Sequence, residues 1–333
     1  MITVIGGSGF IGTRLCNILS KENIHPFVII DKAESLKHPD KFLFCDVRSF
    51  DKLTNLIPNE SIIINLAAEH KDDVRPKSLY QEVNVDGAKN ICDVARLKNI
   101  NTIIFTSSVA VYGFSASDTD EDALINPFND YGKSKYAAEN IYKIWQEELP
   151  MERTLVIIRP TVVFGEDNRG NVYNLLRQIA SKKFIPIGLG KNKKSMAYVE
   201  NIAAFILYSL KYKKGLFIFN YVDKPDFQIN ELISLVNYTI GIKNPSSFRI
   251  PYFIGISIGY IFDLYSLIFN KKLVISSIRI KKYCSDSVFN SSIAKTGFSP
   301  PVTLVDGLIK TLKHEFIQDS KSLPHSKTKS LSE

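Results

Sequence analysis

The chain has 333 residues, of which 45% are hydrophobic and 23% are charged. These proportions are typical of folded globular proteins, and they exclude a largely disordered chain and a polytopic membrane protein. The four cysteines include no Cys-x-x-Cys pair. We therefore expect no disulfide framework and no zinc or other metal site, as is usual in a reducing cytoplasm.

Short apolar segments alternate with helical patterns through the first half of the chain. The predicted strands are Ile2–Ile5, Phe27–Ile30, Phe42–Phe44, Ile62–Leu66, Thr102–Phe105 and Thr154–Ile158. A helical pattern over residues 11–20 separates the first two, and similar patterns separate most of the others. This alternation predicts an α/β fold with a doubly wound parallel sheet of the Rossmann type.

The rhythm of the sequence changes after residue 165. Longer helical patterns cover residues 171–182, 199–213 and 229–240, and Leu216–Tyr221 is a predicted strand. We therefore expect a nucleotide-binding domain over residues 1–165 and a smaller mixed substrate lobe over residues 166–317, interleaved with the sheet. The polar residues 318–333 predict a flexible tail.

Basic side chains are concentrated in one stretch. Residues 181–282 carry 16 basic and five acidic side chains, a net charge of +11 in a chain whose total is +8. Such a block attracts phosphates, an anionic membrane surface or nucleic acid. The alternative is a basic surface that is exposed to solvent and binds no partner. The sequence contains no helix-turn-helix, zinc-finger or RNA-binding pattern, so we expect no nucleic-acid partner.

Within this block, Tyr252–Phe269 is an apolar stretch of 18 residues with one charge, Asp263, and Lys271 and Lys272 follow it. A membrane span usually needs about 20 apolar residues and rarely tolerates a central carboxylate. The aromatic residues and the flanking lysines instead suit a helix that lies in the membrane interface. A buried core helix or a helix in a dimer contact is the alternative.

Gly6, Gly9 and Gly12 lie between the first predicted strand and the first predicted helix. In this context glycines permit a tight turn, close approach of the backbone to a pyrophosphate and close packing of helix on strand, while the helix N-terminus binds the negative charge. Asp31 ends the second strand, where a carboxylate binds ribose hydroxyls and disfavours a 2′-phosphate. The sequence therefore predicts an NAD site, with Asp46 near the adenine edge.

Tyr131 and Lys135 are four residues apart, which places them one turn apart on the same face of a helix. A tyrosine, with a pKa of about 10, is a poor base at neutral pH, and a nearby ammonium lowers that pKa by stabilising the phenolate. Ser108, at the end of the fifth strand, can bond the same substrate oxygen. These three side chains are the predicted catalytic residues, and Lys135 can also bond the nicotinamide ribose.

Over roughly residues 1–315 the chain resembles the extended short-chain dehydrogenase/reductases of the sugar epimerase/dehydratase group. The matching segments are, in order, Gly6–Gly12, Leu66-Ala67-Ala68, Asn84, Thr106–Gly113 (TSSVAVYG), Tyr131–Lys135 and Arg159-Pro160. The resemblance implies further NAD contacts at Phe10, Ile11, Val47, Leu66, Ala67, Ala68, Asn84 and Pro160. It also implies that Thr106 and Ser108 contact the sugar.

The reaction can be narrowed within this group. Family dehydratases carry an Asp-Glu pair directly after the catalytic hydroxyl, whereas Val109-Ala110 follows Ser108, so dehydration is disfavoured. Longer stretches are similar to one branch, the 4-epimerases of N-acetylglucosaminyl-diphospho-undecaprenol in O-antigen assembly. These stretches are residues 67–74, 168–176, 194–199 and 221–226.

This resemblance implies conversion to the N-acetylgalactosaminyl epimer by transient oxidation at C4, at the cytoplasmic face of the inner membrane. Three alternatives remain open. They are a 4-keto-reductase, a 4-epimerase of a UDP-N-acetylhexosamine, and a non-catalytic nucleotide-binding partner of a membrane glycan assembly.

The resemblance also places Asn171, Lys194 and Arg279 at positions that contact the substrate pyrophosphate. Lys194 replaces the arginine common in UDP-sugar epimerases and lacks its bidentate geometry, and each of the three is otherwise an ordinary surface residue. The expected partners are a lipid-linked sugar diphosphate and the cytoplasmic membrane surface, with a homodimer left open.

Overall fold

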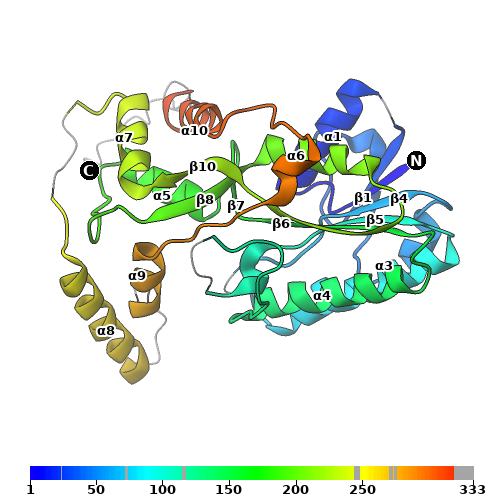
Figure 1. Cartoon of the computed structure of the whole chain (residues 1–333), viewed down its shortest axis with the longest axis horizontal. Coiled ribbons are helices and arrows are strands. Elements are labelled where there is room, and N and C mark those ends of the chain that lie inside the picture. The colour runs from blue at the N-terminus through cyan, green and yellow to red at the C-terminus, as the bar shows by residue number, and fades with distance from the viewer. Residues whose placement is uncertain are drawn as a thin grey trace, which may run out of the picture. The chain divides into compact units, whose positions relative to one another are not determined.

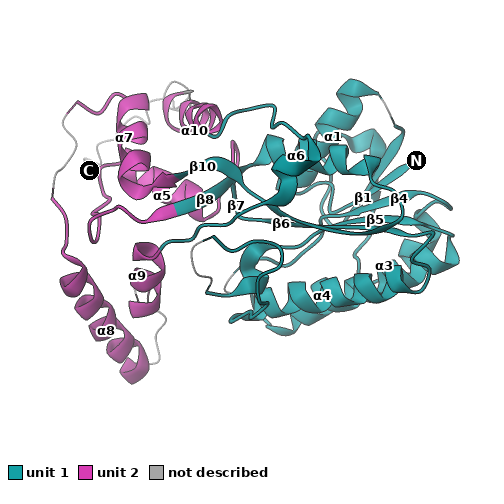
Figure 2. Cartoon of the chain, in the orientation of Figure 1, with its two compact units in different colours: residues 1–163, 194–226, 286–304 teal, residues 164–193, 227–285, 305–333 magenta. Residues whose placement is uncertain are grey.

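The computed structural model describes residues 1–23, 25–71, 74–114, 118–243, 248–269, 273 and 276–318. The chain divides into two compact units, each assembled from segments far apart in sequence (Figure 2). Unit 1 consists of residues 1–163, 194–226 and 286–304. Unit 2 consists of residues 164–193, 227–285 and the chain from Val305 onward.

The main sheet belongs to unit 1. In the described part of the chain it has seven strands in the order β3-β2-β1-β4-β5-β6-β9, and every neighbouring pair is parallel. The strands are β1 (Ile2–Ile5), β2 (Phe27–Asp31), β3 (Phe42–Phe44), β4 (Ile62–Asn65), β5 (Thr102–Thr106), β6 (Thr154–Pro160) and β9 (Gly215–Tyr221). The predicted doubly wound parallel sheet is confirmed. Its order reverses between β1 and β4, and sheets of this kind bind ligands beyond the carboxyl ends of the strands at that point.

Helices cover both faces of this sheet (Figure 1). Alternate strand residues face opposite sides, so Val4 and Ile104 pack with one helical layer and Ile5 and Phe105 pack with the other. The first layer contains α1 (Phe10–Glu22) and α6 (Val199–Tyr208). The second contains α2 (Phe50–Leu56), α3 (Gly87–Leu97) and α4 (Asp130–Glu147). Burial on both faces explains why the strands are continuous apolar runs in the sequence.

A second sheet joins β10 (Asp223–Gln228), β8 (Lys193–Tyr198) and β7 (Val162–Phe164), in that order. The sequence pattern predicted none of these strands. β8 begins with two lysines, and β10 contains Lys224, Pro225 and Asp226, all residues that disfavour strands. Pairing with neighbouring strands, rather than local preference, makes these segments extended.

Unit 2 is largely helical. Its helices are α5 (Asn171–Ala180), α7 (Ile229–Thr239), α8 (Tyr252–Phe269), α9 (Ser277–Cys284) and nearly all of α10 (Leu304–Lys313), which continues into a π-helical turn, His314–Gln318. Within the unit, α5 packs on α7 and α8 packs on α9. The helix predicted for residues 199–213 ends earlier, at Tyr208. The tail predicted for residues 318–333 lies, apart from Gln318, outside the described residues.

Candidate active site

The glycine turn after β1 has the geometry that a dinucleotide pyrophosphate requires. Gly6 has φ +78°, and a Cβ on Gly12 would lie 2.5 Å from the Gly6 carbonyl oxygen, so neither position accepts a side chain. α1 begins directly after Gly9 with no side-chain cap and no acidic residue in its first turn. Its N-terminal N–H groups therefore remain available to an anion. The Ser8 hydroxyl is buried with no hydrogen-bond partner among the described residues, as expected where a polar ligand binds.

Asp31 lies beside this turn. Its carboxylate accepts hydrogen bonds from the backbone N–H groups of Ser8 and Ala33, both at 3.0 Å. These bonds orient the carboxylate and leave it further acceptor capacity for ribose hydroxyls. The turn and the carboxylate together fit NAD.

Asp46 is engaged differently. Arg48 donates to both of its carboxylate oxygens, at 3.0 and 2.8 Å, and this interaction lowers the pKa of Asp46. The other predicted cofactor contacts open α1, end β6 or follow the carboxyl ends of other strands. They are Phe10, Ile11, Val47, Leu66, Ala67, Ala68 and Pro160.

Asn84 has a structural task in the described chain. Its side chain is buried, accepts from the Glu69 N–H at 2.8 Å, and donates to the Glu69 carbonyl and to the Ser134 hydroxyl. It thereby fastens the loop after β4 to α4. An NAD contact through this side chain remains a prediction.

Tyr131 and Lys135 lie in the first two turns of α4, as predicted. The Asn129 side chain caps this helix by accepting from the Gly132 N–H at 2.8 Å. A Cβ on Gly132 would lie 2.5 Å from the Ala110 carbonyl oxygen. Only glycine lets the start of α4 approach the turn that follows β5, and that turn carries Ser108.

The three hydroxyl residues at the end of β5 have different environments. The buried Ser107 hydroxyl donates a hydrogen bond to Glu139 at 2.5 Å, so its proton is already used within the protein. The Ser108 hydroxyl accepts from the Ala110 N–H at 3.1 Å, so its own proton can be donated to a ligand. The Thr106 hydroxyl is buried and has no hydrogen-bond partner in the described part of the chain.

Lys135 is almost fully buried, with 2% of its surface exposed. Its Nζ lies 4.4 Å from the centroid of the Phe105 ring. Burial lowers the pKa of Lys135 to about 7. The negative charge of Glu139 acts in the opposite direction and raises this pKa, but burial is the larger effect. Burial of this ammonium therefore disfavours its charged form in the nucleotide-free protein.

A buried network that the sequence analysis did not identify supports these residues. Glu139, one turn beyond Lys135, accepts from Arg159 Nε and Nη2 at 2.9 and 2.6 Å, and Arg159 also donates to the Tyr112 hydroxyl at 2.7 Å. Burial disfavours the Arg159 charge, but the hydrogen bonds that Arg159 donates to Glu139 outweigh this effect and raise the pKa of Arg159. The four-residue spacing from Lys135 was the available sequence signal for Glu139.

Replacing Glu139 with glutamine should lower the free energy of unfolding by about 3–5 kcal/mol, because Arg159 would remain charged and buried without its counter-ion. Urea unfolding measures this loss. The double variant Glu139→Gln/Arg159→Met should lose less than the sum of the single variants, because no unpaired charge remains. A single variant as stable as wild type would contradict this account.

The predicted substrate residues are divided between the units. Lys194 lies in β8 of unit 1, where it pairs with Ser287. Asn171 is the exposed first residue of α5, and Arg279 is exposed on α9, both in unit 2. Their contact with a pyrophosphate remains a prediction.

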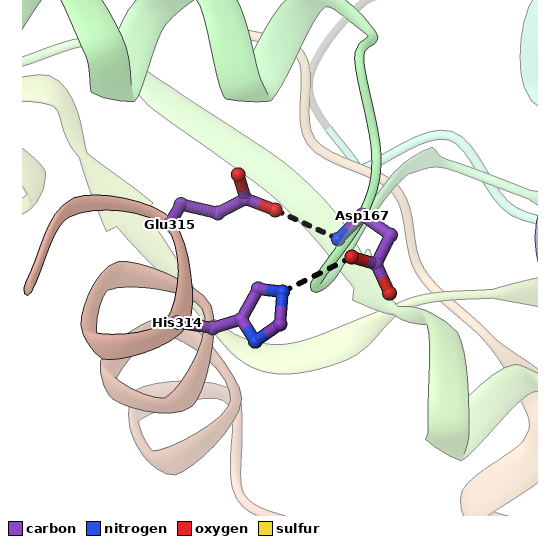
Figure 3. Close-up of side chains that lie close together, drawn as sticks. All are labelled: Asp167, His314 and Glu315. Atoms are coloured by element: carbon purple, nitrogen blue, oxygen red, sulfur yellow. Dashed lines mark hydrogen bonds and ion pairs between the residues drawn. The ribbon is translucent and has the colours of Figure 1, made fainter. Parts of the chain in front are cut away.

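Unit 2 also brings together Asp167, His314 and Glu315, whose ligand-type atoms lie within 4.8 Å of one another (Figure 3). Ion pairing accounts for this cluster. His314 bonds Asp167 at 3.0 Å, Glu315 accepts from the Asp167 N–H, and Arg169 donates to both Glu315 oxygens. Because Arg169 neutralises Glu315, the cluster links the π-helical turn to the loop before α5 through ion pairs and hydrogen bonds.

Comparison with known proteins gives consistent results. Residues 2–220 match the family model described as "NAD dependent epimerase/dehydratase family". The N-acetyl-alpha-D-glucosaminyl-diphospho-ditrans,octacis-undecaprenol 4-epimerase of Escherichia coli O157:H7 is 46% identical over 96% of each chain. The UDP-glucose 4-epimerase of Vibrio cholerae is 24% identical over 93% of this chain and 94% of its own. The crystal structure of UDP-glucuronic acid 4-epimerase from Bacillus cereus in complex with NAD covers 94% of this chain and 97% of its own, with a TM-score of 0.72 and 20% identity, a likeness of fold.

Proposed function

The chain belongs to the NAD dependent epimerase/dehydratase family, and from this membership we propose that it is the 4-epimerase of N-acetylglucosaminyl-diphospho-undecaprenol. The observation that carries the proposal is the 46% identity, over 96% of each chain, to a relative with that activity in its name. The product is the N-acetylgalactosaminyl epimer, and the setting is O-antigen assembly at the cytoplasmic face of the inner membrane.

In this proposal, side chains on α4 and on the turn after β5 carry out proton transfer. Tyr131, as the phenolate, takes the proton of the sugar 4-hydroxyl while C4 loses its hydride. Ser108 donates a hydrogen bond to the same oxygen, which its acceptor bond from Ala110 leaves it free to do. After the keto sugar has turned within the site, Tyr131 returns the proton to that oxygen, so the reaction has no net demand for redox equivalents.

The glycine turn and Asp31 would hold NAD⁺, which would supply a reversible acceptor for the C4 hydride and so allow its return to the opposite face of the ring. Lys135 stabilises the Tyr131 phenolate through its positive charge. Glu139 and Arg159 hold the inner side of α4, and through Ser107 they hold the end of β5. Val109-Ala110 offers no acid–base pair for the expulsion of water, which favours epimerisation over dehydration.

The decisive experiment compares the purified enzyme on N-acetylglucosaminyl-diphospho-polyprenol and on UDP-N-acetylglucosamine, with no NAD(P)H added. We expect N-acetylgalactosamine to form on the lipid and little or none on the UDP-sugar. Identification of the released sugar by chromatography measures the result.

The other outcomes identify the alternatives. Product only on the UDP-sugar would make the protein a soluble-substrate epimerase. No product on either, with NAD(P)H consumed by a 4-keto sugar, would make it a reductase. No turnover under any condition would leave a non-catalytic nucleotide-binding role.

A polyprenyl diphosphate is anchored in the bilayer, so the enzyme must reach the membrane surface. The +11 block over residues 181–282 and the apolar helix α8 supply an electrostatic and an apolar signal, and stable attachment usually takes two. The membrane surface is therefore the partner that the proposed function requires.

A further inference from the structure

We propose that α8 lies within one leaflet of an anionic membrane, parallel to its surface, and that α9 lies on the aqueous side of α8. This inference rests on the proposed function, because it specifies how the protein reaches a lipid-linked substrate. It assigns the membrane contact to one helical pair and excludes a transmembrane span.

The first observation is a continuous apolar face on α8. Of the described helices, α8 is long and apolar enough to cross a membrane, yet only 11% of it is buried. The exposed side chains recur at helical spacing on one side and include Phe253, Ile261, Leu264 and Ile268. Such a face on a soluble protein marks an interaction site.

The serine on this face already has a hydrogen-bond partner within the helix. Ser257 lies between Phe253 and Ile261 on the exposed face, and its hydroxyl donates to the Phe253 carbonyl at 2.8 Å. A serine bonded to its own helix needs no water. This serine therefore adds no unpaired polar group when the face enters an apolar medium.

The opposite face of α8 is occupied by α9. Gly255 and Gly259 are the buried residues of α8; a Cβ on Gly255 would meet the Ile187 side chain, and a Cβ on Gly259 would lie 2.8 Å from Ser277 Cα in α9. Asp263, on this same face, accepts from the Ser277 N–H at 3.1 Å and so binds the first residue of α9. The two helices therefore form one packed hairpin.

This packing decides between a helix that spans the membrane and one that lies along it. α8 has 18 residues, about 27 Å at 1.5 Å per residue, barely the thickness of the hydrocarbon core. α9 is attached near the middle of α8, so a span would carry α9 and its cations into the bilayer centre. Arg279, Lys281 and Lys282 are exposed on α9, and burying them there is costly. The parallel orientation avoids this cost.

Charge identifies the occupant as lipid rather than a second copy of the chain. The cations of α9 adjoin the apolar face, and a hydrogen bond with the Tyr260 hydroxyl raises the pKa of Lys281. Lys281 is therefore fully charged at neutral pH. A symmetric dimer through this hairpin would bring like charges together, whereas anionic headgroups neutralise them.

Co-sedimentation of the full chain with vesicles tests the apolar face. We expect binding to phosphatidylglycerol/phosphatidylethanolamine vesicles, and at least about a tenfold fall in partition for Leu264→Glu/Ile268→Glu. The matched control is Leu97→Glu/Ile144→Glu, two exposed apolar residues of α3 and α4, which should change partition less than about twofold. Wild type that does not bind, or an α8 variant that binds as wild type does, overturns the inference.

Two further measurements bear on charge and orientation. Lys281→Gln/Lys282→Gln should weaken binding to phosphatidylglycerol vesicles about tenfold or more and leave binding to phosphatidylcholine unchanged. Phe253→Cys and Ile268→Cys, at the two ends of the apolar face and each in a Cys284→Ser background, should react alike with an impermeant maleimide on vesicles that expose the cytoplasmic face. Labelling at one end only would show a span and overturn the inference.

Activity separates failure of this inference from failure of the proposed function. Leu264→Glu/Ile268→Glu should retain wild-type turnover of a water-soluble, short-chain isoprenyl diphosphate of N-acetylglucosamine, and lose at least about tenfold on the long-chain lipid in vesicles. Equal turnover by variant and wild type in vesicles would refute the helix assignment and leave the epimerase intact. A wild type that converts neither lipid would refute the function.

Discussion

Replacing Tyr131 with phenylalanine should reduce turnover of the lipid-linked sugar by at least about a thousandfold. The substitution keeps the aromatic ring, so it removes only the oxygen that takes and returns the proton of the 4-hydroxyl. Loss of proton transfer at C4 stops the oxidation and the reduction alike, because both half-reactions use the same oxygen. The rate of formation of N-acetylgalactosamine measures the effect.

The matched control for this variant is Tyr136→Phe, a half-buried tyrosine of the same helix that packs against Val111, Tyr112 and Phe289. Tyr136→Phe should keep nearly full turnover. Tyr131→Phe should still bind NAD, because the glycine turn and Asp31 lie on other elements of unit 1. Full activity in Tyr131→Phe would remove the catalytic assignment.

Replacing Lys135 with methionine should have two opposite effects. Turnover should fall by about two to three orders of magnitude at pH 7, because the phenolate of Tyr131 loses the ammonium that stabilises it. The residual activity should rise toward higher pH, because a tyrosine without a neighbouring ammonium has an ordinary pKa of about 10 and ionises only in alkaline solution. The nucleotide-free protein should at the same time become more stable.

The direction of the stability change follows from the lowered pKa of Lys135. The folded protein releases the Lys135 proton near pH 7, whereas the unfolded chain holds it up to its ordinary pKa of 10.5. Between these values the unfolded state binds more protons, so wild-type stability rises with pH. Below pH 7 the full cost of burying the charge is present.

Lys135→Met should therefore raise the free energy of unfolding by roughly 2–4 kcal/mol at pH 6, after allowance for the lost contact with Phe105. The gain should shrink as the pH rises from 7 to 10. Urea unfolding at pH 6 and pH 9 measures it, with Lys133→Met, an exposed lysine of the same helix, as the control. A gain that does not change with pH would contradict the burial of a titrating ammonium.

Much of the fold could be predicted from the sequence because its signals are local. Gly6, Gly9 and Gly12 are required by the backbone of one turn, and the predicted strands of the main sheet were confirmed to within two residues at each end. Tyr131 and Lys135 lie on one helix, so their spacing alone places them on a common face. The family followed from the order of these motifs.

The buried network was harder to predict because its members come from distant segments. Glu139 and Arg159 are 20 residues apart on α4 and β6, and Tyr112 lies on the turn after β5. A charged residue in a helix usually faces solvent, and only the packing of that helix on the sheet buries Glu139. β10 likewise is a strand because of its neighbours, against the preference of its own residues.

Local patterns in the amino-acid sequence were enough to predict the parallel sheet, the glycine turn, the tyrosine–lysine pair and the apolar helix at residues 252–269. These features depend on side-chain periodicity and on short spacings along the chain, and neither requires knowledge of which distant segments are neighbours in space. Tertiary structure alone decided which polar groups are buried and paired, and which face of α8 is open. Asp263 reads as an isolated charge in an apolar run, and only its bond to Ser277 shows that α9 attaches to the middle of that helix.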